Sequence, residues 1–294
     1  FCAVKLKQMK NVLVTGAEGQ LGSSLKKIAG NFPQYNFIYT DKDNLDICNQ
    51  VELKAFFESN SLYCVLHFAA YTAVDKAEQE ATLAEEINSK ASLSIAKLCA
   101  EYNTRLVYIS TDYVFEGKDC KPHSTQETTN PLSVYGKTKL KGEENCLENN
   151  PLTFVIRTSW LYSEFKSNFV KTMINLSQTK EELNVIYDQV GSPTYARDLA
   201  DFAVRAIEHI NSKRILHYSN HGVCSWYDFA RKAIELWTEK TIRINPILTS
   251  QYPTLATRPK FSVFDKSESE KLLNITIPHW EDSLKDCIKE LKAQ

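Results

Sequence analysis

The sequence predicts a doubly wound α/β fold, in which helices cover both faces of a parallel sheet and a smaller C-terminal lobe is added. Three observations predict this class. Strand-like and helix-like segments alternate in the first half of the chain, the strand-like segments are apolar throughout, and glycines recur after the first of them. Strands without polar alternation are buried on both faces, as in a parallel sheet between two helix layers. The alternation of elements supplies the crossover helices that such a sheet needs.

The first half of the chain accounts for most of the sheet. Strands are expected at residues 11–15, 35–40, 62–68 and 105–109, and helices at about 19–29, 50–58 and 82–102. The last helix is expected because apolar residues recur in that segment at helical spacing. Residues 1–8, which precede Met9, are treated as an extension outside the fold.

The second half of the chain is less regular. A further strand is expected at residues 153–156, and helices at about 167–179, 195–210, 225–239 and 280–292. Proline and polar clusters separate these segments. We therefore expect a nucleotide-binding domain over residues 9–150. Residues 151–294 are expected to complete the sheet and to form a substrate-binding lobe, with a soft and interleaved boundary.

The composition excludes several classes of protein. The 294 residues include 35 basic and 36 acidic side chains, which disfavours a nucleic-acid binder because such domains usually carry a basic excess. The longest uncharged apolar stretch, residues 61–74, is too short for a membrane-spanning helix. The 8 cysteines are scattered without a C-x-x-C pair, which favours reduced thiols in a cytoplasmic protein over a disulfide framework.

A glycine-rich loop follows the first expected strand. Gly16, Gly19 and Gly22 form G-x-x-G-x-x-G and lead into a helix. Glycines allow the backbone to approach a pyrophosphate closely, and the helix N-terminus offers free N–H groups. Asp41, at the end of the second strand, is placed to hold the ribose hydroxyls of a dinucleotide. Lys42 follows it and can tolerate a 2′-phosphate, so NADH and NADPH both remain open.

Tyr135 and Lys139 are four residues apart, which places both side chains on one face of a helix. A nearby ammonium favours ionisation of a phenol, so the pair can exchange a proton near neutral pH. Tyr162 and Lys166 repeat the spacing but lack a helix start, and we treat that copy as coincidence. Before Tyr135 in the chain, the fourth strand ends at Ser110–Thr111. A hydroxyl group there can meet a substrate oxygen together with Tyr135.

The glycine loop, the strand-four hydroxyls and Tyr-x-x-x-Lys together resemble an extended short-chain dehydrogenase/reductase. Longer motifs are similar to those of the dTDP-4-dehydrorhamnose reductase family and cover nearly the whole chain from Met9. These motifs are Gly19–Gly22, Ala69–Glu78, Ser110–Phe115, Asn130–Leu140, Arg157–Trp160 and Asp188–Thr194.

The resemblance implies roles for particular residues. The implied cofactor-binding residues are Gly16, Gly19, Gln20, Leu21, Asp41, Asp46, Ile47, Ala69, Ala70, Tyr71, Tyr135 and Lys139. Thr111, Asp112 and Trp160 would contact the sugar nucleotide, with Trp160 stacking on it. Tyr135 would donate the proton, Lys139 would lower its pKa and hold the nicotinamide ribose, and Thr111 would hydrogen-bond the reacting oxygen.

The resemblance also implies a reaction. An NADPH- or NADH-dependent oxidoreductase would reduce the C4 ketone of dTDP-4-dehydro-L-rhamnose to dTDP-L-rhamnose. Its partner would be the dTDP-sugar substrate, with no nucleic acid, membrane or metal, and the chain would be a monomer or a homodimer.

Two other functions remain open. One is another sugar-nucleotide epimerase or dehydratase of the same fold. The other is a non-catalytic regulatory subunit resembling that of methionine adenosyltransferase, although the intact Tyr135 and Lys139 argue against it. Related 4,6-dehydratases carry Thr-Asp-Glu where this chain has Thr111-Asp112-Tyr113, and a tyrosine is a poor base at neutral pH.

Finally, His217, His221 and Cys224 have a zinc-like spacing, but no fourth ligand is near in sequence.

Overall fold

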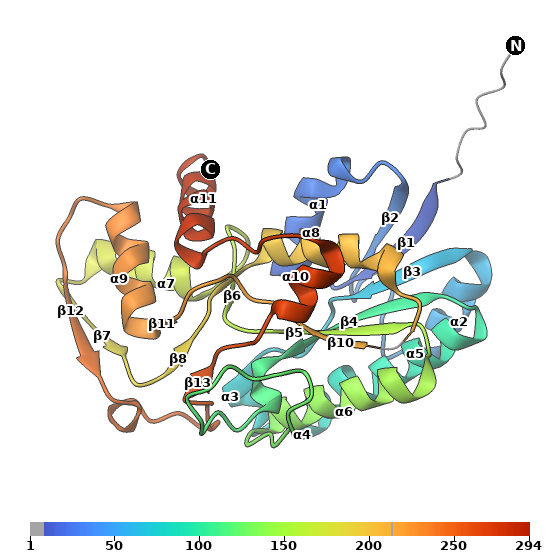
Figure 1. Cartoon of the computed structure of the whole chain (residues 1–294), viewed down its shortest axis with the longest axis horizontal. Coiled ribbons are helices and arrows are strands. Elements are labelled where there is room, and N and C mark those ends of the chain that lie inside the picture. The colour runs from blue at the N-terminus through green and yellow to red at the C-terminus, as the bar shows by residue number, and fades with distance from the viewer. Residues whose placement is uncertain (1–8, 213) are drawn as a thin grey trace, which may run out of the picture.

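A six-stranded parallel sheet forms the centre of the computed structural model, which describes residues 9–212 and 214–294 (Figure 1). Its strand order is β10–β5–β4–β3–β1–β2, and each neighbouring pair is parallel. The strands are β1 (Lys10–Thr15), β2 (Tyr35–Thr40), β3 (Leu62–His67), β4 (Arg105–Thr111), β5 (Thr153–Thr158) and β10 (Arg214–His217). The predicted doubly wound α/β class is confirmed.

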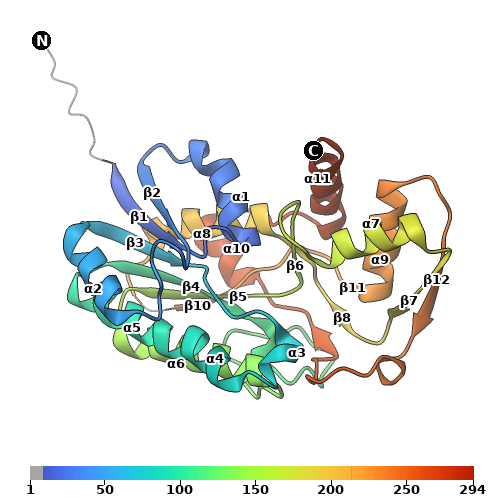
Figure 2. The same ribbon diagram turned by 180° about the vertical axis from the view of Figure 1, so that it is seen from behind.

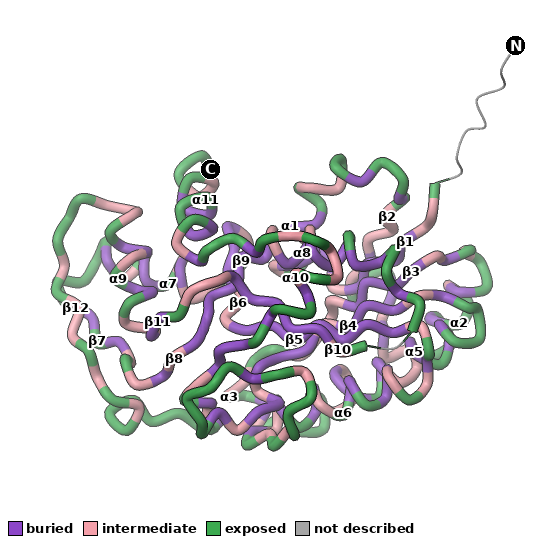
Figure 3. Tube along the Cα trace, in the orientation of Figure 1, coloured by how far each residue is buried: buried purple, intermediate pink, exposed green. Residues whose placement is uncertain are grey.

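Helices cover both faces of the sheet (Figure 2). One layer contains α1 (Gln20–Ile28) and α8 (Ala196–Ala206), and the other contains α2 (Gln50–Ser59), α5 (Ala91–Glu101) and α6 (Val134–Asn149). Successive side chains of a strand point to opposite faces. Accordingly, Val12 and Val14 of β1 pack into the core beneath α1 and α8, whereas Leu13 packs into the core beneath α2, α5 and α6. The inner strands β1, β3, β4 and β5 are mostly buried, whereas the edge strand β2 is mostly half-buried (Figure 3).

The direction of chain winding changes at β1. Its two neighbours in the sheet are β2 and β3, so the crossovers lead to opposite sides of β1. In open α/β sheets, this reversal leaves a crevice beyond the carboxyl ends of the two strands concerned, and ligands bind there. The strand order therefore predicts a ligand crevice where Thr15 ends β1 and His67 ends β3. The short α3 (Val74–Ala77) follows β3 on this side of the sheet.

The helix expected at residues 82–102 is not uniform. It begins as α4 (Ala81–Glu85), passes through a π-helical turn at Glu86–Lys90, and continues as α5. A π-helical turn widens the helix by one residue and is often found at functional sites. The polar residue Asn88 lies in this turn and is buried. Hydrophobic spacing cannot reveal such a turn, because the apolar residues on either side keep a helical period.

A second lobe lies beyond the carboxyl edge of the sheet (Figure 1). Its helices are α7 (Phe169–Thr179), α9 (Trp226–Trp237) and α11 (Trp280–Lys292), with α10 (Ser267–Leu273) beside β10. Its short strands are β6 (Leu161–Tyr162), β7 (Glu182–Ile186), β8 (Val190–Gly191), β9 (Thr194–Tyr195), β11 (Cys224–Ser225), β12 (Arg243–Ile247) and β13 (Phe261–Ser262). Aromatic residues of α7, α9 and α11 form its core around Phe229. Because β5 and β10 belong to the central sheet and α8 covers one of its faces, the chain after residue 150 contributes to both parts, and the division there stays a prediction.

Two further findings concern the cysteines and the lengths of the helices. The seven cysteines among the described residues are free thiols, and Cys120 alone of these is exposed. Over residues 9–212 and 214–294, every helix is too short or too polar to cross a membrane.

Candidate active site

The glycine-rich loop leaves β1 in a conformation that needs glycine. Gly16 has φ of +66°, in the left-handed region, and a Cβ placed on it would lie 2.6 Å from the backbone nitrogen of Ala69. A Cβ on Gly22 would lie 2.5 Å from the Cα of Ala17. Side chains at either position would push the loop away from β3 or from its own helix. The two glycines therefore bring the loop, α1 and the end of β3 into close contact.

The N-terminus of α1 is suited to a negatively charged ligand. Its N-cap residue is Gly19, which has no side chain to cap the helix, and the first turn contains no acidic residue. The unsatisfied N–H groups and the positive end of the helix dipole attract anions such as a diphosphate. These features fit the phosphate groups of a dinucleotide cofactor, as the motif predicts.

Asp41 connects the end of β2 to this loop. Its Oδ2 accepts a hydrogen bond of 2.9 Å from the backbone N–H of Glu18, and its Oδ1 accepts one of 2.8 Å from Lys42 N–H. The carboxylate therefore lies beside the glycine loop, at the position predicted for a ribose ligand. Asp46 accepts a hydrogen bond from Cys48 N–H, and Ile47 is buried in the core under α2 and α5. Contacts of these residues with a cofactor stay predictions.

The segment after β3 is held by a residue that sequence reasoning missed. Asn88, in the π-helical turn, accepts a 2.8 Å hydrogen bond from Tyr71 N–H through Oδ1 and donates one of 3.1 Å to Tyr71 O through Nδ2. It thereby fixes the backbone of Tyr71, while Thr15 Oγ1 accepts a hydrogen bond from Ala69 N–H. Asn88 is one of many polar residues in segment 82–102, so the sequence held no distinct signal for this role.

A second missed residue, His67, is buried at the end of β3. Its Nδ1 lies 2.8 Å from Thr15 Oγ1 and its Nε2 lies 3.1 Å from Ser92 Oγ. Ser92 in turn donates to Asn88 O. Burial, with the nearby Lys139 charge, lowers the pKa of His67 to about 3, so the ring is neutral near pH 7. The resulting chain of hydrogen bonds links the glycine loop to the π-helical turn.

Tyr135 and Lys139 lie on the first turns of α6. Ser133 caps this helix by accepting a hydrogen bond from Gly136 N–H, as its sequence position predicts. A Cβ on Gly136 would lie 2.3 Å from Tyr113 O, and a Cβ on Gly142 would lie 2.2 Å from Asn88 O. These glycines let α6 pack directly against the turn after β4 and against the π-helical turn. The packing places Tyr135 at the carboxyl edge of the sheet.

Burial dominates the electrostatics of this pair. Lys139 is 2% exposed, and its Nζ donates a 2.7 Å hydrogen bond to Ile109 O and lies 4.1 Å from the centre of the Tyr108 ring. Loss of hydration lowers the pKa of Lys139 to about 7. Burial also raises the pKa of Tyr135 to about 12, while the neighbouring Thr111 hydroxyl acts in the opposite direction. We expected Lys139 to lower the phenol pKa, but its ammonium contacts the Ile109 carbonyl and Tyr135 keeps a raised value. That role stays a prediction.

The end of β4 brings polar groups beside Tyr135. Thr111 donates a 3.0 Å hydrogen bond to Asp112 Oδ1 and accepts one from Tyr113 N–H. Burial raises the pKa of Asp112 to about 6, and its Oδ2 has no hydrogen-bond partner. Ser110 Oγ is also buried without a partner. Buried polar atoms without partners at the carboxyl edge of a parallel sheet are suited to bind a polar ligand.

Trp160 follows β5 with φ of +49°, an uncommon conformation for a residue other than glycine. Its ring stacks on Trp226 of α9, with centroids 3.6 Å apart and planes inclined by 11°. A Cβ on Gly191 would lie 2.8 Å from the Trp160 ring, so β8 also contacts it closely. In this conformation one face of the indole is covered by Trp226, and stacking of Trp160 on a sugar nucleotide stays a prediction.

The alternative motifs do not form sites. Tyr162 lies in β6 with its hydroxyl buried, and Lys166 lies in the following loop, so this copy of Tyr-x-x-x-Lys is not on a helix. His217 Nδ1 lies 3.1 Å from His123 O, whereas His221 Nε2 lies 2.9 Å from Glu270 Oε1. Within the described part of the chain, no group of three or more His, Cys, Asp or Glu side chains is arranged to hold a metal ion.

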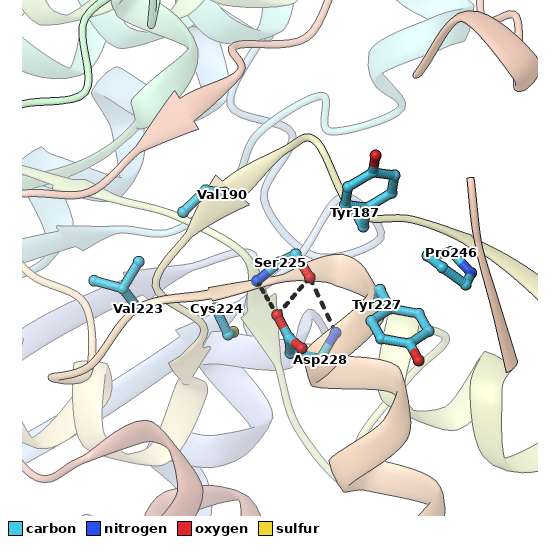
Figure 4. Close-up of a pocket in the computed structure, with 8 residues that line it drawn as sticks. All are labelled: Tyr187, Val190, Val223, Cys224, Ser225, Tyr227, Asp228 and Pro246. Atoms are coloured by element: carbon cyan, nitrogen blue, oxygen red, sulfur yellow. Dashed lines mark hydrogen bonds between the residues drawn. The ribbon is translucent and has the colours of Figure 1, made fainter. Parts of the chain in front are cut away.

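An open pocket lies on the second lobe between β8, β11 and β12 (Figure 4). Tyr187, Tyr227 and Pro246 line one side of it, and Ser225 and Asp228 lie at its base. Asp228 Oδ2 accepts a 3.1 Å hydrogen bond from Ser225 N–H, and Ser225 Oγ accepts one of 3.1 Å from Asp228 N–H, which together form the capping box of α9. The polar groups of this pocket therefore serve the fold of α9, and the reactive groups gather instead around Tyr135.

The fold and the site together define a Rossmann-type α/β protein with a Tyr–Lys site at the carboxyl edge of its sheet. The model of the family described as "RmlD substrate binding domain" matches residues 9–293. The chain belongs to this family. The resemblance to dTDP-4-dehydrorhamnose reductases that the motifs predict is confirmed.

Curated relatives match over nearly their whole length. A dTDP-4-dehydrorhamnose reductase of Aggregatibacter actinomycetemcomitans is 35% identical over 288 residues, 95% of this chain and 98% of that protein. The spore coat polysaccharide biosynthesis protein SpsK of Bacillus subtilis (strain 168) is 37% identical over 285 residues, 96% of this chain and 98% of that protein.

Two solved structures are similar to the structure of this chain. The dTDP-4-dehydrorhamnose reductase of Bacillus anthracis str. Ames, in complex with NADP, has a TM-score of 0.92 at 36% identity, covering 96% of this chain and 100% of that one. The UDP-glucose 4-epimerase of Brucella ovis, in complex with NAD, has a TM-score of 0.79 at 18% identity over 96% of this chain and 98% of that one, which shows a shared fold alone.

Proposed function

We propose that this protein reduces the C4 ketone of dTDP-4-dehydro-L-rhamnose to dTDP-L-rhamnose with NADPH or NADH. The grouping of Thr111, Tyr135 and Lys139 at the carboxyl edge of the sheet carries the proposal, because a reductase of this kind needs a proton donor at the edge where such sheets bind their ligands. The family membership and the named reductases among its relatives support the substrate.

The side chains of this protein would donate the proton and orient the ketone. The bound cofactor supplies the hydride. Tyr135, protonated near neutral pH because its pKa is raised to about 12, donates its proton to the oxygen that becomes the alkoxide. Thr111, beside the phenol, hydrogen-bonds the same oxygen. Lys139, with its pKa lowered to about 7, can return a proton to the phenol after the reaction.

The cofactor would lie across the crevice beyond β1 and β3. Gly16, Gly19, Gln20 and Leu21 would bind its diphosphate at the N-terminus of α1, where no acidic residue opposes it. The adenosine ribose would meet Asp41 at the end of β2. Asp46 and Ile47 would lie on the adenosine side, and Ala69, Ala70 and Tyr71 along the end of β3.

The substrate would lie between the sheet and the second lobe. Asp112, whose Oδ2 has no hydrogen-bond partner, would accept a hydrogen bond from the sugar. Trp160 would contact the sugar nucleotide. We further propose that residues 151–294 supply most of the substrate lobe, and that the protein acts in the cytoplasm as a monomer or a homodimer without nucleic acid.

Tyr113 favours the reductase over a dehydratase. Its ring packs edge-on against Tyr135, with centroids 5.4 Å apart, and burial raises the pKa of its phenol further above the ordinary value. A phenol of this kind is a poor base for removing the proton next to a ketone. The position that carries glutamate in related 4,6-dehydratases therefore lacks a base here.

One pair of assays tests the proposal. With dTDP-4-dehydro-L-rhamnose, we expect oxidation of NADPH or NADH and formation of dTDP-L-rhamnose. With dTDP-glucose and NAD⁺, we expect no 4-keto-6-deoxy product. Catalytic formation of that product would assign the chain to a dehydratase, and no cofactor oxidation with the ketone would favour a regulatory subunit.

A further inference from the structure

The second lobe reaches the glycine loop through Asn168, which is the N-cap residue of α7. Its Oδ1 accepts a 3.2 Å hydrogen bond from Lys171 N–H, and this capping bond fixes which end of the amide faces the helix. The other end, Nδ2, donates to Ser163 O at 2.7 Å and to Gln20 Oε1 at 3.0 Å. Gln20 is the first residue of α1.

This contact determines the orientation of the Gln20 amide. A glutamine side chain has one acceptor end and one donor end. The acceptor end of Gln20 is Oε1. Asn168 Nδ2 donates a hydrogen bond to this oxygen, and Ser163 Oγ lies 3.0 Å from it. The reversed orientation would place two NH₂ groups against each other and would leave an oxygen, instead of an NH₂ group, as the free end of the Gln20 amide. The donor end of Gln20, Nε2, therefore remains available for a phosphate oxygen.

The segment that carries Asn168 is also attached to α1 at a second point. Glu164, which is 2% exposed, accepts hydrogen bonds from Tyr195 Oη at 3.0 Å and from Lys27 Nζ at 3.3 Å. Lys27 lies in the last turn of α1, whereas Gln20 begins it. Contacts at both ends of α1 fix the register of residues 163–168 against this helix.

We propose that Asn168 is a positioning residue for the cofactor site: it orients Gln20 so that the glutamine amide donates to the cofactor diphosphate. The inference rests on the proposed placement of the cofactor at the glycine loop. It makes a residue of the second lobe part of the dinucleotide site, although the sequence places it more than a hundred residues from the glycine motif.

A double-mutant cycle on NADPH binding tests this proposal, with the dissociation constant measured by fluorescence titration. Asn168→Ser keeps a capping hydroxyl for α7 but removes the donor to Gln20. We expect it to weaken NADPH binding about fivefold to tenfold, the usual size of one hydrogen bond. In a Gln20→Ala background the same change should have no further effect. Thr172→Ala is the matched control, because the Thr172 hydroxyl bonds to the Asn168 carbonyl and not to Gln20.

The outcomes separate this inference from the proposed function. An equal loss from Asn168→Ser in both backgrounds, or a similar loss in Thr172→Ala, would indicate a general effect of α7 and would overturn the inference. Weakening by Gln20→Ala without weakening by Asn168→Ser would overturn the inference but leave the cofactor site in place. Unchanged binding in Gln20→Ala would overturn both the inference and the assigned role of Gln20, and absence of NADPH binding by the parent protein would reject the cofactor site itself.

Discussion

The Lys139 ammonium donates a 2.7 Å hydrogen bond to the carbonyl oxygen of Ile109 and thereby joins α6 to the end of β4. The same helix carries Tyr135, and the same strand ends at Thr111. This bond therefore ties the helix that carries the proton donor to the strand that ends at the hydroxyl beside it. It also gives a hydrogen-bond acceptor to an ammonium that the packing of α6 against β4 buries.

Replacement of Tyr135 tests the proton donor. We expect Tyr135→Phe to keep the fold and the NADPH affinity and to lower turnover by about two to four orders of magnitude, the range of general acid–base catalysis. Turnover is measured with dTDP-4-dehydro-L-rhamnose under saturating cofactor. Tyr162→Phe is the control, because the Tyr162 hydroxyl is buried without a partner in the second lobe. Turnover of Tyr135→Phe near that of the control would reject the assignment.

Replacement of Asp41 tests cofactor discrimination. We expect Asp41→Ala to weaken NADH binding more than NADPH binding, because a carboxylate holds ribose hydroxyls and repels a 2′-phosphate. Some loss for both cofactors is also expected, since Asp41 holds Glu18 N–H in the glycine loop. Titration of both cofactors measures the difference, and Asp43→Ala at an exposed neighbouring position is the control. Equal losses would leave Asp41 with a purely structural role.

The buried pair of Glu143 and Arg157 tests how α6 is attached to β5. Arg157 donates to both carboxylate oxygens at 2.7 to 3.1 Å, and the two side chains are 1% and 3% exposed. Glu143→Gln would leave a buried guanidinium without its counter-ion, and we expect a loss of about 3–5 kcal/mol in the free energy of unfolding.

The control is Glu144→Gln, which removes an exposed pair with Lys141. Such pairs contribute about 1 kcal/mol or less, so urea unfolding should distinguish the two variants clearly. Similar stabilities of Glu143→Gln and Glu144→Gln would contradict this account of the helix.

His67 predicts a specific dependence of stability on pH. Its pKa is about 3 in the folded protein and about 6.5 when exposed, so the unfolded chain binds a proton first as the pH falls. Stability from this residue is present above pH 6.5 and is lost on acidification toward pH 3. The advantage of the parent over His67→Asn should therefore shrink by about 2–3 kcal/mol between about pH 7.5 and about pH 4.5.

Urea unfolding of both proteins at the two pH values measures this difference, and the remaining titrating groups are common to both. A constant difference between parent and variant would mean that His67 is not held neutral by its burial between Thr15 and Ser92.

Replacement of Trp160 tests the substrate lobe. We expect Trp160→Ala to raise the KM for the sugar nucleotide about tenfold or more, because a large aromatic contact would be lost, and to leave NADPH binding unchanged. Steady-state kinetics and cofactor titration provide the two measurements. Trp237→Ala, at the end of α9, is the control. If both variants had the same KM, Trp160 would serve only to pack against Trp226.

The sequence by itself determined the main strands and helices of the central sheet and the residue types of the proposed site. Apolar runs at residues 62–68 and 153–156 match β3 and β5 because a strand buried on both faces tolerates no polar alternation. The glycine loop, the cap at Ser133 and the Tyr135–Lys139 spacing are local signals, since each depends on a few consecutive residues. For the same reason, the motifs identified the family.

Only the tertiary structure decided which distant residues meet. Asn88 against Tyr71, Arg157 against Glu143, and Asn168 against Gln20 are contacts between segments far apart in the chain, and spacing holds no information about them. The electrostatics also depended on burial: Lys139 has a lowered pKa and contacts Ile109 because α6 packs it against β4. Desolvation and packing act over the folded chain as a whole, so a local pattern predicts the residue type but not the environment that sets its chemistry.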